Sequence, residues 1–142
     1  MPVRFDGRPG RYLTGVDLVS VSRIASLLTD YPDTFREYAF TDAERAYCEE
    51  RYDPPEHYAA RWAVKEAYVK AVGEEGANPD LSSIEVVGDP RSALSLSGDG
   101  LELLERAAGR AGTTLDAASV DVSMAHERTA DLAVGFVLVS FD

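Results

Sequence analysis

The strongest constraint on the fold is a helical stretch at residues 61–71, which reads RWAVKEAYVKA. Residues four apart lie along one row of a helix surface, so Trp62, Glu66 and Lys70 share a row, with small alanines between them. A carboxylate flanked by lysines above an alanine-lined seam is well placed to hold a metal ion that also carries phosphate. The alternative interpretation is a Glu–Lys pair on a solvated helix face.

Flanking residues mark the limits of this helix. The DPP at residues 53–55 opens it, because proline fits the first turn of a helix, where its missing donor is not needed. The helix should end near Val72, with Gly73 in the left-handed cap position. Upstream, Thr41 and Glu44 begin a second helix as a capping box, in which each side chain meets an unpaired backbone donor. We therefore assign Glu44 a structural role.

The rest of the chain alternates between strand and helix patterns. A first strand ends at Asp17, and Pro32 breaks the chain after the helix that follows. The expected strands are residues 11–18, 84–87, 93–96, 118–125 and 132–139, and the other expected helices are residues 19–28, 42–51 and 101–111, the last closed by Gly112. The fold class is α+β, with a central antiparallel sheet packed by the long helix. We expect one domain at residues 11–142 after a loose lead-in at residues 1–10.

Composition narrows the functional classes. The 142 residues, 45% of them apolar, suffice for the core of one domain. A formal net charge of -11 argues against nucleic acid as the main partner, because phosphate backbones attract basic surfaces. The single cysteine, Cys48, allows no internal disulfide and is interpreted as a partly buried thiol. There is no signal-peptide pattern, and the longest apolar run, residues 132–139, is too short to span a bilayer. We expect a soluble, cytoplasmic protein.

Two further motifs accompany the long helix. Asp17 stands in an apolar strand that reads GVDLV, and SMAH near the end of the chain closes with His126. Together with FTDAE at residues 40–44, these motifs in this order resemble the 4′-phosphopantetheinyl transferases, specifically the small holo-acyl-carrier-protein synthase type. The resemblance spans roughly residues 12–139. It implies the fold of that family and transfer of the 4′-phosphopantetheine arm of coenzyme A to a serine of an apo carrier protein, with release of 3′,5′-ADP.

The chemistry of that reaction suits the residue types present. The attacked atom is a pyrophosphate phosphorus, and Mg²⁺ on one or two carboxylates neutralises the charge there. Asp17 and Glu66 would supply the carboxylates, and Lys70 would contact a phosphate oxygen as a point charge. The resemblance implies the same three assignments. The serine proton would pass to Glu66 itself or to a metal-bound water that Glu66 orients.

Other residues are candidates for binding coenzyme A, the co-substrate. The resemblance places His126 near its nucleotide end, although a histidine at a hairpin end is more often a turn residue, and Ser123 is a weaker companion. Arg61 and Lys65 are expected to serve phosphate binding or helix packing, with a solvated face as the alternative. His57 is interpreted as helix surface.

The chain departs from the family pattern near the cofactor and the partner. Glu74 and Glu75 replace a small Thr-Gly or Ser-Gly, and they would weaken binding of an anionic ligand unless they point away. Residues 19–40 offer two arginines against three carboxylates (Arg23, Arg36; Asp30, Asp33, Glu37), so steering of a strongly acidic carrier is weak. This favours a less acidic acyl or peptidyl carrier domain, of a polyketide or peptide assembly line, over the fatty-acid carrier. The pathway stays open between fatty acid and polyketide biosynthesis.

The resemblance also bears on assembly. Single-domain members of the family form trimers, so it implies a homotrimer with Asp17 and Glu66 from one subunit and His126 or its neighbours from the next. A monomer with a closed site is the alternative. For the function, the alternative is a non-catalytic module of the same fold that binds coenzyme A or a carrier protein.

Overall fold

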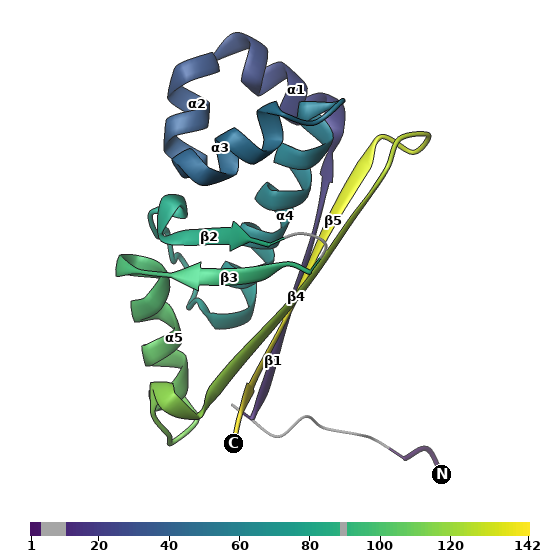
Figure 1. Cartoon of the computed structure of the whole chain (residues 1–142). Coiled ribbons are helices and arrows are strands. Elements are labelled where there is room, and N and C mark those ends of the chain that lie inside the picture. Colours follow the sequence, from purple (N-terminus) through teal and green to yellow (C-terminus); the bar gives the residue numbers. More distant parts are fainter. Residues whose placement is uncertain (4–10, 89–90) are drawn as a thin grey trace.

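The structure is a computed structural model that describes residues 1–3, 11–88 and 91–142. Its centre is a three-stranded antiparallel sheet in the order β1-β5-β4, with one long helix, α4, packed against it (Figure 1). β4 and β5 form a hairpin, and β1 pairs with β5 along its whole length. The bounds of these elements are Tyr12–Ser20 for β1, Pro54–Val72 for α4, Ala118–Glu127 for β4 and Leu132–Phe141 for β5.

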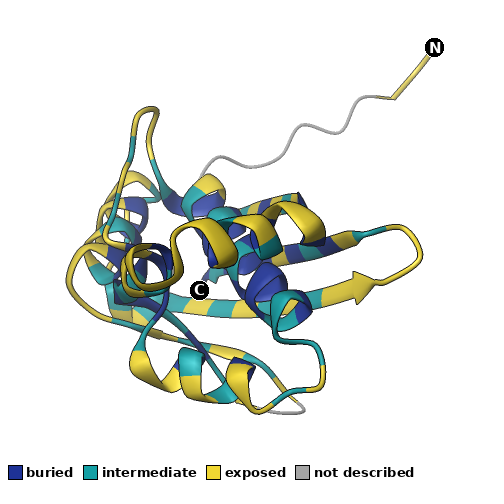
Figure 2. Ribbon diagram, turned by 90° about the horizontal axis from the view of Figure 1, so that it is seen from above, coloured by how far each residue is buried: buried dark blue, intermediate teal, exposed yellow. Residues whose placement is uncertain are grey.

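Smaller elements cover α4 on its other sides. Three short helices gather around its N-terminal part, and a two-stranded antiparallel sheet and a last helix lie beside its C-terminal part (Figure 1). These elements are α1 (Val21–Asp30), α2 (Pro32–Ala39), α3 (Asp42–Glu49), β2 (Ile84–Val87), β3 (Ala93–Leu96) and α5 (Gly98–Arg110), with short 3-10 turns at Leu81–Ser83 and Leu115–Ala117. Most residues of α4 are buried, and in Figure 2 the buried segments (dark blue) lie toward the middle of the molecule.

The backbone of α4 lies directly on the sheet at two glycines. A Cβ atom on Gly15 would lie 1.8 Å from the carbonyl oxygen of Ala67, and a Cβ atom on Gly135 would lie 2.3 Å from the backbone nitrogen of Val64. Gly135 is also the cross-strand partner of Asp17. Because no side chain separates the helix from the strands here, α4 presents its polar row close to Asp17.

The expected α+β class is confirmed, as are the expected strands and helices to within a few residues. The capping box is present: Thr41 N donates to Glu44 Oε1 at 2.9 Å, and Glu44 N donates to Thr41 Oγ1 at 3.2 Å. The lead-in expected at residues 1–10 falls largely on residues 4–10, which lie outside the described residues.

Two local expectations are wrong and one is incomplete. Pro32 does more than break the chain: it occupies the first turn of α2, a helix that the sequence analysis missed. Asp17 lies within β1 and not at its end, because the strand continues to Ser20, which caps α1 by accepting from Arg23 N at 3.2 Å. Gly73 is the C-cap of α4 as expected, but its φ of -78° shows that it does not adopt the left-handed conformation. A Cβ atom there would lie 2.5 Å from the Val69 carbonyl oxygen.

Among the described residues, no helix combines the length and apolar character needed to cross a membrane.

We expect Gly15→Ala to lower the free energy of unfolding by about 3 kcal/mol or more, because its methyl group would overlap the backbone of α4. Gly109→Ala is the matched control. It lies in α5, where an added Cβ atom meets nothing within 4 Å, so the substitution should stabilise the chain by up to about 1 kcal/mol. Urea unfolding of both variants measures the difference. Equal midpoints would contradict the direct contact between α4 and β1.

Candidate active site

Asp17, Glu66 and Lys70 come together where α4 crosses β1. Asp17 shares a face of the strand with Gly15, and this face is turned toward α4. Lys70 Nζ donates to Asp17 Oδ1 at 2.8 Å and to the Val16 carbonyl oxygen at 3.1 Å. The Lys70 side chain is 55% exposed, whereas that of Asp17 is 17% exposed. A cation that can still reach solvent therefore sits beside a largely covered carboxylate.

Glu66 completes this group one helical turn before Lys70. Burial raises the pKa of Glu66, the nearby Asp17 charge raises it further, and Lys70 partly opposes both. The site therefore holds two mutually repelling carboxylates and one cation. A further positive charge would stabilise such a site by reducing the repulsion between its carboxylates. Carboxylate oxygens are the donors that Mg²⁺ prefers. Lys70 bonds Oδ1 of Asp17, and a carboxylate has a second oxygen that can bind an ion. The residues fit a magnesium site.

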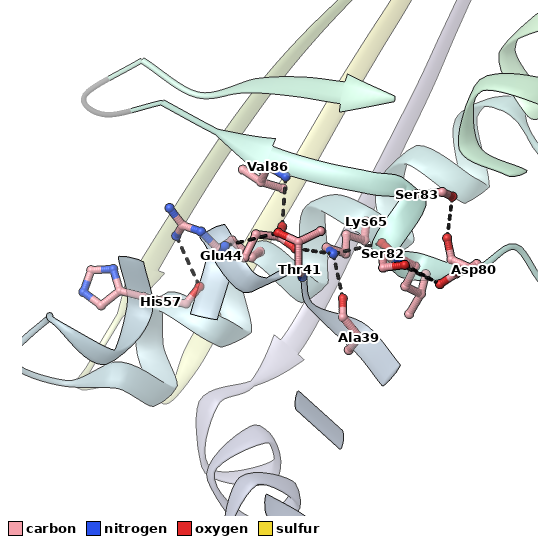
Figure 3. Close-up of polar contacts among 11 residues, drawn as sticks. Ala39, Thr41, Glu44, His57, Lys65, Asp80, Ser82, Ser83 and Val86 are labelled. Atoms are coloured by element: carbon pink, nitrogen blue, oxygen red, sulfur yellow. Dashed lines mark hydrogen bonds and ion pairs between the residues drawn. The ribbon is translucent and has the colours of Figure 1, made fainter. Parts of the chain in front are cut away.

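Lys65 lies on another side of α4 and is fully buried. Its ammonium group donates to the Ala39 carbonyl oxygen at 2.6 Å, to Glu44 Oε1 at 2.6 Å and to the Leu81 carbonyl oxygen at 2.9 Å (Figure 3). Glu44 Oε2 in turn accepts from Val86 N at 2.9 Å. An ammonium group has three donors, and all three are used here. The solvated-face interpretation is thus wrong for Lys65, and in this geometry it offers no donor to a phosphate.

Arg61 is also buried, with 2% of its surface exposed. Its guanidinium carbon lies 4.0 Å from the ring centroid of Tyr47, and Nη1 donates to the His57 carbonyl oxygen at 3.4 Å. Its Nε has no hydrogen-bond partner among the described residues. The solvated-face alternative is wrong here too. Of the two roles first expected for Arg61, these contacts favour helix packing.

His126 lies at the opposite end of α4 from Glu66. Its Nδ1 is 3.3 Å from Oε2 of Glu56, whose other oxygen accepts from Arg128 Nε at 2.8 Å. This Arg128 bond is the largest cause of the lowered pKa of Glu56. Glu56 and Glu66 are ten residues apart on one helix, which corresponds to about 15 Å. Within one chain, His126 is therefore not part of the Asp17–Glu66–Lys70 group.

Sequence reasoning missed Glu56 and Arg128 as polar neighbours of His126. His126 lies near the end of β4 and Arg128 lies in the turn just after it, so strand alternation alone did not predict that both contact Glu56. His57 was interpreted as helix surface, yet it is half-buried, with its ring 5.3 Å from that of His126. Burial is the main cause of its lowered pKa. Ser123 is exposed on the other face of the sheet and does not accompany His126 within the chain.

The acidic loop after α4 is partly neutralised. Glu74 Oε1 accepts from Arg110 Nη1 at 2.8 Å, and Arg110 Nη2 donates to the Val72 carbonyl oxygen at 2.8 Å. Glu74 is therefore held toward α5, while Glu75 is exposed. The single thiol, Cys48, is buried, and burial raises its pKa to about 12, which leaves it unreactive.

Known proteins resemble this chain over most of its length. The family model described as the 4′-phosphopantetheinyl transferase superfamily matches residues 14–133. The holo-[acyl-carrier-protein] synthase of Syntrophus aciditrophicus (strain SB) is 40% identical over 119 residues, which cover 82% of this chain and 87% of that relative.

Two solved structures share the fold. The ACPS-CoA complex of Chronobacterium ammoniagenes superposes with a TM-score of 0.73 at 30% identity, covering 92% of this chain and 98% of the other. The holo-(acyl-carrier-protein) synthase of Bacillus anthracis str. Ames, solved in complex with CoA (3′,5′-ADP), gives a TM-score of 0.66 at 27% identity, with 92% and 96% covered. The fold expected from the resemblance is confirmed.

We expect Lys65→Met to lower the free energy of unfolding by about 3–5 kcal/mol, because it leaves the Glu44 carboxylate buried without its cation. The double variant Glu44→Gln/Lys65→Met should recover part of that loss, since no buried charge is then unpaired. Denaturant unfolding of the two single variants and the double variant gives the coupling energy. A Lys65→Met chain of normal stability with weakened coenzyme A binding would instead restore the phosphate-binding role.

Proposed function

The chain belongs to the 4′-phosphopantetheinyl transferase superfamily, and from this premise we propose that it transfers the 4′-phosphopantetheine arm of coenzyme A to a serine of an apo carrier protein. The other product is 3′,5′-ADP. The observation that carries the proposal is the meeting of Asp17, Glu66 and Lys70 where α4 crosses β1. A binding module without chemistry would have no need to keep two repelling carboxylates and a lysine together.

In this proposal, each of the three residues has a separate task. Asp17 and Glu66 would hold Mg²⁺, which would supply positive charge beside the pyrophosphate. Lys70 turns its exposed ammonium from Asp17 toward a phosphate oxygen, a shift that its long side chain permits. Glu66 receives the serine proton, directly or through a water that it orients.

The transfer forms one bond to phosphorus and breaks another. The serine oxygen forms a bond to the phosphorus that carries the pantetheine arm, and the bond from that phosphorus to the bridging oxygen of 3′,5′-ADP breaks. The leaving phosphate keeps the electron pair of the broken bond. The proton of the serine passes to Glu66, so the new phosphodiester is formed without a free alkoxide.

We assign the nucleotide end of coenzyme A to His126 and Arg128. Arg128 is 66% exposed, and both side chains lie beside the buried carboxylate of Glu56. Their separation from Glu66 along α4 suits a site completed by two subunits. Arg61 lies beneath this region, packed on Tyr47, and supports it from inside the helix layer.

A homotrimer is the proposed assembly. The sheet face that points away from α4 carries exposed apolar side chains, with Val16 at 55%, Leu18 at 63% and Phe136 at 41% exposure. Val16 and Phe136 are cross-strand partners, so the patch is continuous across β1 and β5. An apolar sheet face of this kind favours contact with another copy. Ser123, the partner of Phe136 in β4, lies on the same face and would meet the neighbouring subunit.

The carrier protein is proposed to be a weakly acidic acyl or peptidyl carrier domain. Of the two arginines in residues 19–40, Arg36 is held by Glu49 at 3.0 Å and by the Pro32 carbonyl oxygen at 2.9 Å. This surface therefore gives little attraction to a strongly acidic partner. The pathway served and the cytoplasmic location expected from the sequence stay predictions.

The decisive experiment is incubation with coenzyme A, Mg²⁺ and a panel of apo carrier proteins of graded net charge, followed by mass spectrometry. A mass gain of one phosphopantetheine on a carrier supports the transferase, and no gain on any carrier refutes it. The order of kcat/KM across the panel, and its salt dependence, tests the carrier separately. A strong preference for the most acidic carrier would refute the proposal of a weakly acidic carrier but not the transferase activity.

We expect Glu66→Gln to lower kcat/KM by at least about 100-fold while raising the midpoint of thermal unfolding. The loss follows from removal of the base and of a metal ligand. The gain follows because the raised pKa of Glu66 means that its charged form is disfavoured in the fold. This cost is present above the raised pKa and disappears as the pH falls through it, so the difference in unfolding midpoint should shrink in acid.

Calorimetry without Mg²⁺ and the mass-detected assay measure these two effects. Glu102→Gln is the control, because Glu102 is a half-exposed glutamate paired only with Arg106 on the α5 surface among the contacts described. It should change stability by no more than about 0.5 kcal/mol and keep activity. Wild-type activity of Glu66→Gln at saturating Mg²⁺ would remove Glu66 from the site.

For the assembly, we expect light scattering to give three times the mass of one chain. Mixing tests the shared site directly. Chains carrying Asp17→Ala and chains carrying His126→Ala, each inactive alone, should regain part of the activity when they are denatured and refolded together. Activity should return only if one site draws on two subunits. An active preparation with the mass of a single chain would refute the shared-site model.

A further inference from the structure

A second cluster of ligand-type side chains lies at the N-terminal end of α4, away from Asp17 and Glu66. It consists of Glu56 and His57 on the helix and His126 at the end of β4. Each can place one ligand atom so that all three atoms lie within 4.8 Å of one another. The closest pair is Oε2 of Glu56 and Nδ1 of His126, at 3.3 Å. The two imidazole rings are 5.3 Å apart.

The cluster is built on supported side chains. The side chain of Glu56 is 6% exposed. Arg128 donates to both of its oxygens, from Nε to Oε1 at 2.8 Å and from Nη2 to Oε2 at 3.4 Å, and Oε2 also lies 3.3 Å from Nδ1 of His126. The ring of His57 packs edge-on against Tyr47, with the ring centroids 6.1 Å apart. A ligand whose orientation is fixed by a second contact loses less entropy when it binds an ion, and such supporting contacts are typical of metal sites.

The donor types select a class of ion. Two imidazole nitrogens and one carboxylate oxygen form the ligand set of Zn²⁺ and related late first-row ions, with a fourth position open to water or a ligand. Mg²⁺ prefers six oxygen donors and gains little from imidazole. The two clusters on α4 therefore differ in chemistry: oxygen donors near Lys70, and mixed nitrogen and oxygen donors near Tyr47.

We propose that Glu56, His57 and His126 bind Zn²⁺ or another late first-row divalent ion at a site separate from that of Asp17 and Glu66. Binding through Nδ1, the nitrogen that lies 3.3 Å from Glu56, would hold the ring of His126 toward Glu56 and His57. The proposed function assigns His126 to the binding of coenzyme A, and the next consequence rests on that assignment. An ion bound to His126 would compete with coenzyme A and inhibit transfer. Mg²⁺ would not relieve that inhibition.

The binding test needs no activity. The full-length, metal-free protein is titrated with Zn²⁺ in a calorimeter and with Co²⁺ by visible absorption, both in excess Mg²⁺. We expect one ion per chain and the absorption of a four- or five-coordinate Co²⁺ site. His57→Gln keeps the size of the side chain and should weaken binding by at least about 10-fold. Asp17→Asn should leave binding unchanged, because Asp17 belongs to the other cluster.

Three results would overturn the proposal: no binding by the wild type, unchanged binding by His57→Gln, or loss of binding in Asp17→Asn. The transfer assay then tests the consequence. His57 has no place in the proposed transfer site, so His57→Gln should keep its basal rate and lose the inhibition by Zn²⁺. A chain that binds Zn²⁺ through His57 but transfers nothing would retain the metal site while refuting the transferase.

Discussion

The backbone of α4 touches β1 and β5 with no side chain between them, and the geometry of the site follows from this contact. At Gly15 and Gly135 an added methyl group would overlap helix backbone. The alanines of α4 face these positions, so helix and sheet approach more closely than bulky residues would allow. The short distance is what allows Lys70, one turn after Glu66, to reach the carboxylate of Asp17 on a strand far away in the sequence.

Different parts of α4 lie in three different environments. The row that holds Glu66 and Lys70 meets the strand and solvent, and it supplies charges that can act on a substrate. The side that holds Lys65 points into the interior, where all three donors of the Lys65 ammonium bond to protein oxygens. The first turn, with Glu56 and His57, meets the end of the hairpin. Residues of one type, such as Lys65 and Lys70, therefore have opposite roles five positions apart.

The sequence could predict what depends on local pattern. The capping box of Thr41 and Glu44, the start of α4 at two prolines and the alternation of β4 and β5 all follow from neighbouring residues. The grouping of Asp17 with Glu66 and Lys70 came from spacing together with a family resemblance. The roles of these residues in transfer stay predictions.

Burial and long-range partners could not be predicted in the same way. Lys65 and Lys70 look alike in the motif, and only the positions of Ala39 and Leu81 decide that Lys65 is enclosed. The contact of Glu56 with His126 joins the start of a helix to the end of a hairpin that follows much later. A glutamate in a first helical turn already has a local explanation in the helix dipole, so its sequence position gives no sign of such a contact.

The enclosed ammonium of Lys65 also has a kinetic consequence. Its three acceptors come from the end of α2, from α3 and from the turn before β2, so they are assembled only when those segments have all docked on α4. Removing an ammonium from water before its acceptors are in place is costly, which favours formation of this contact late in folding. A contact made after the transition state slows unfolding and leaves the folding rate nearly unchanged. This buried ion pair would therefore act chiefly on the lifetime of the native state.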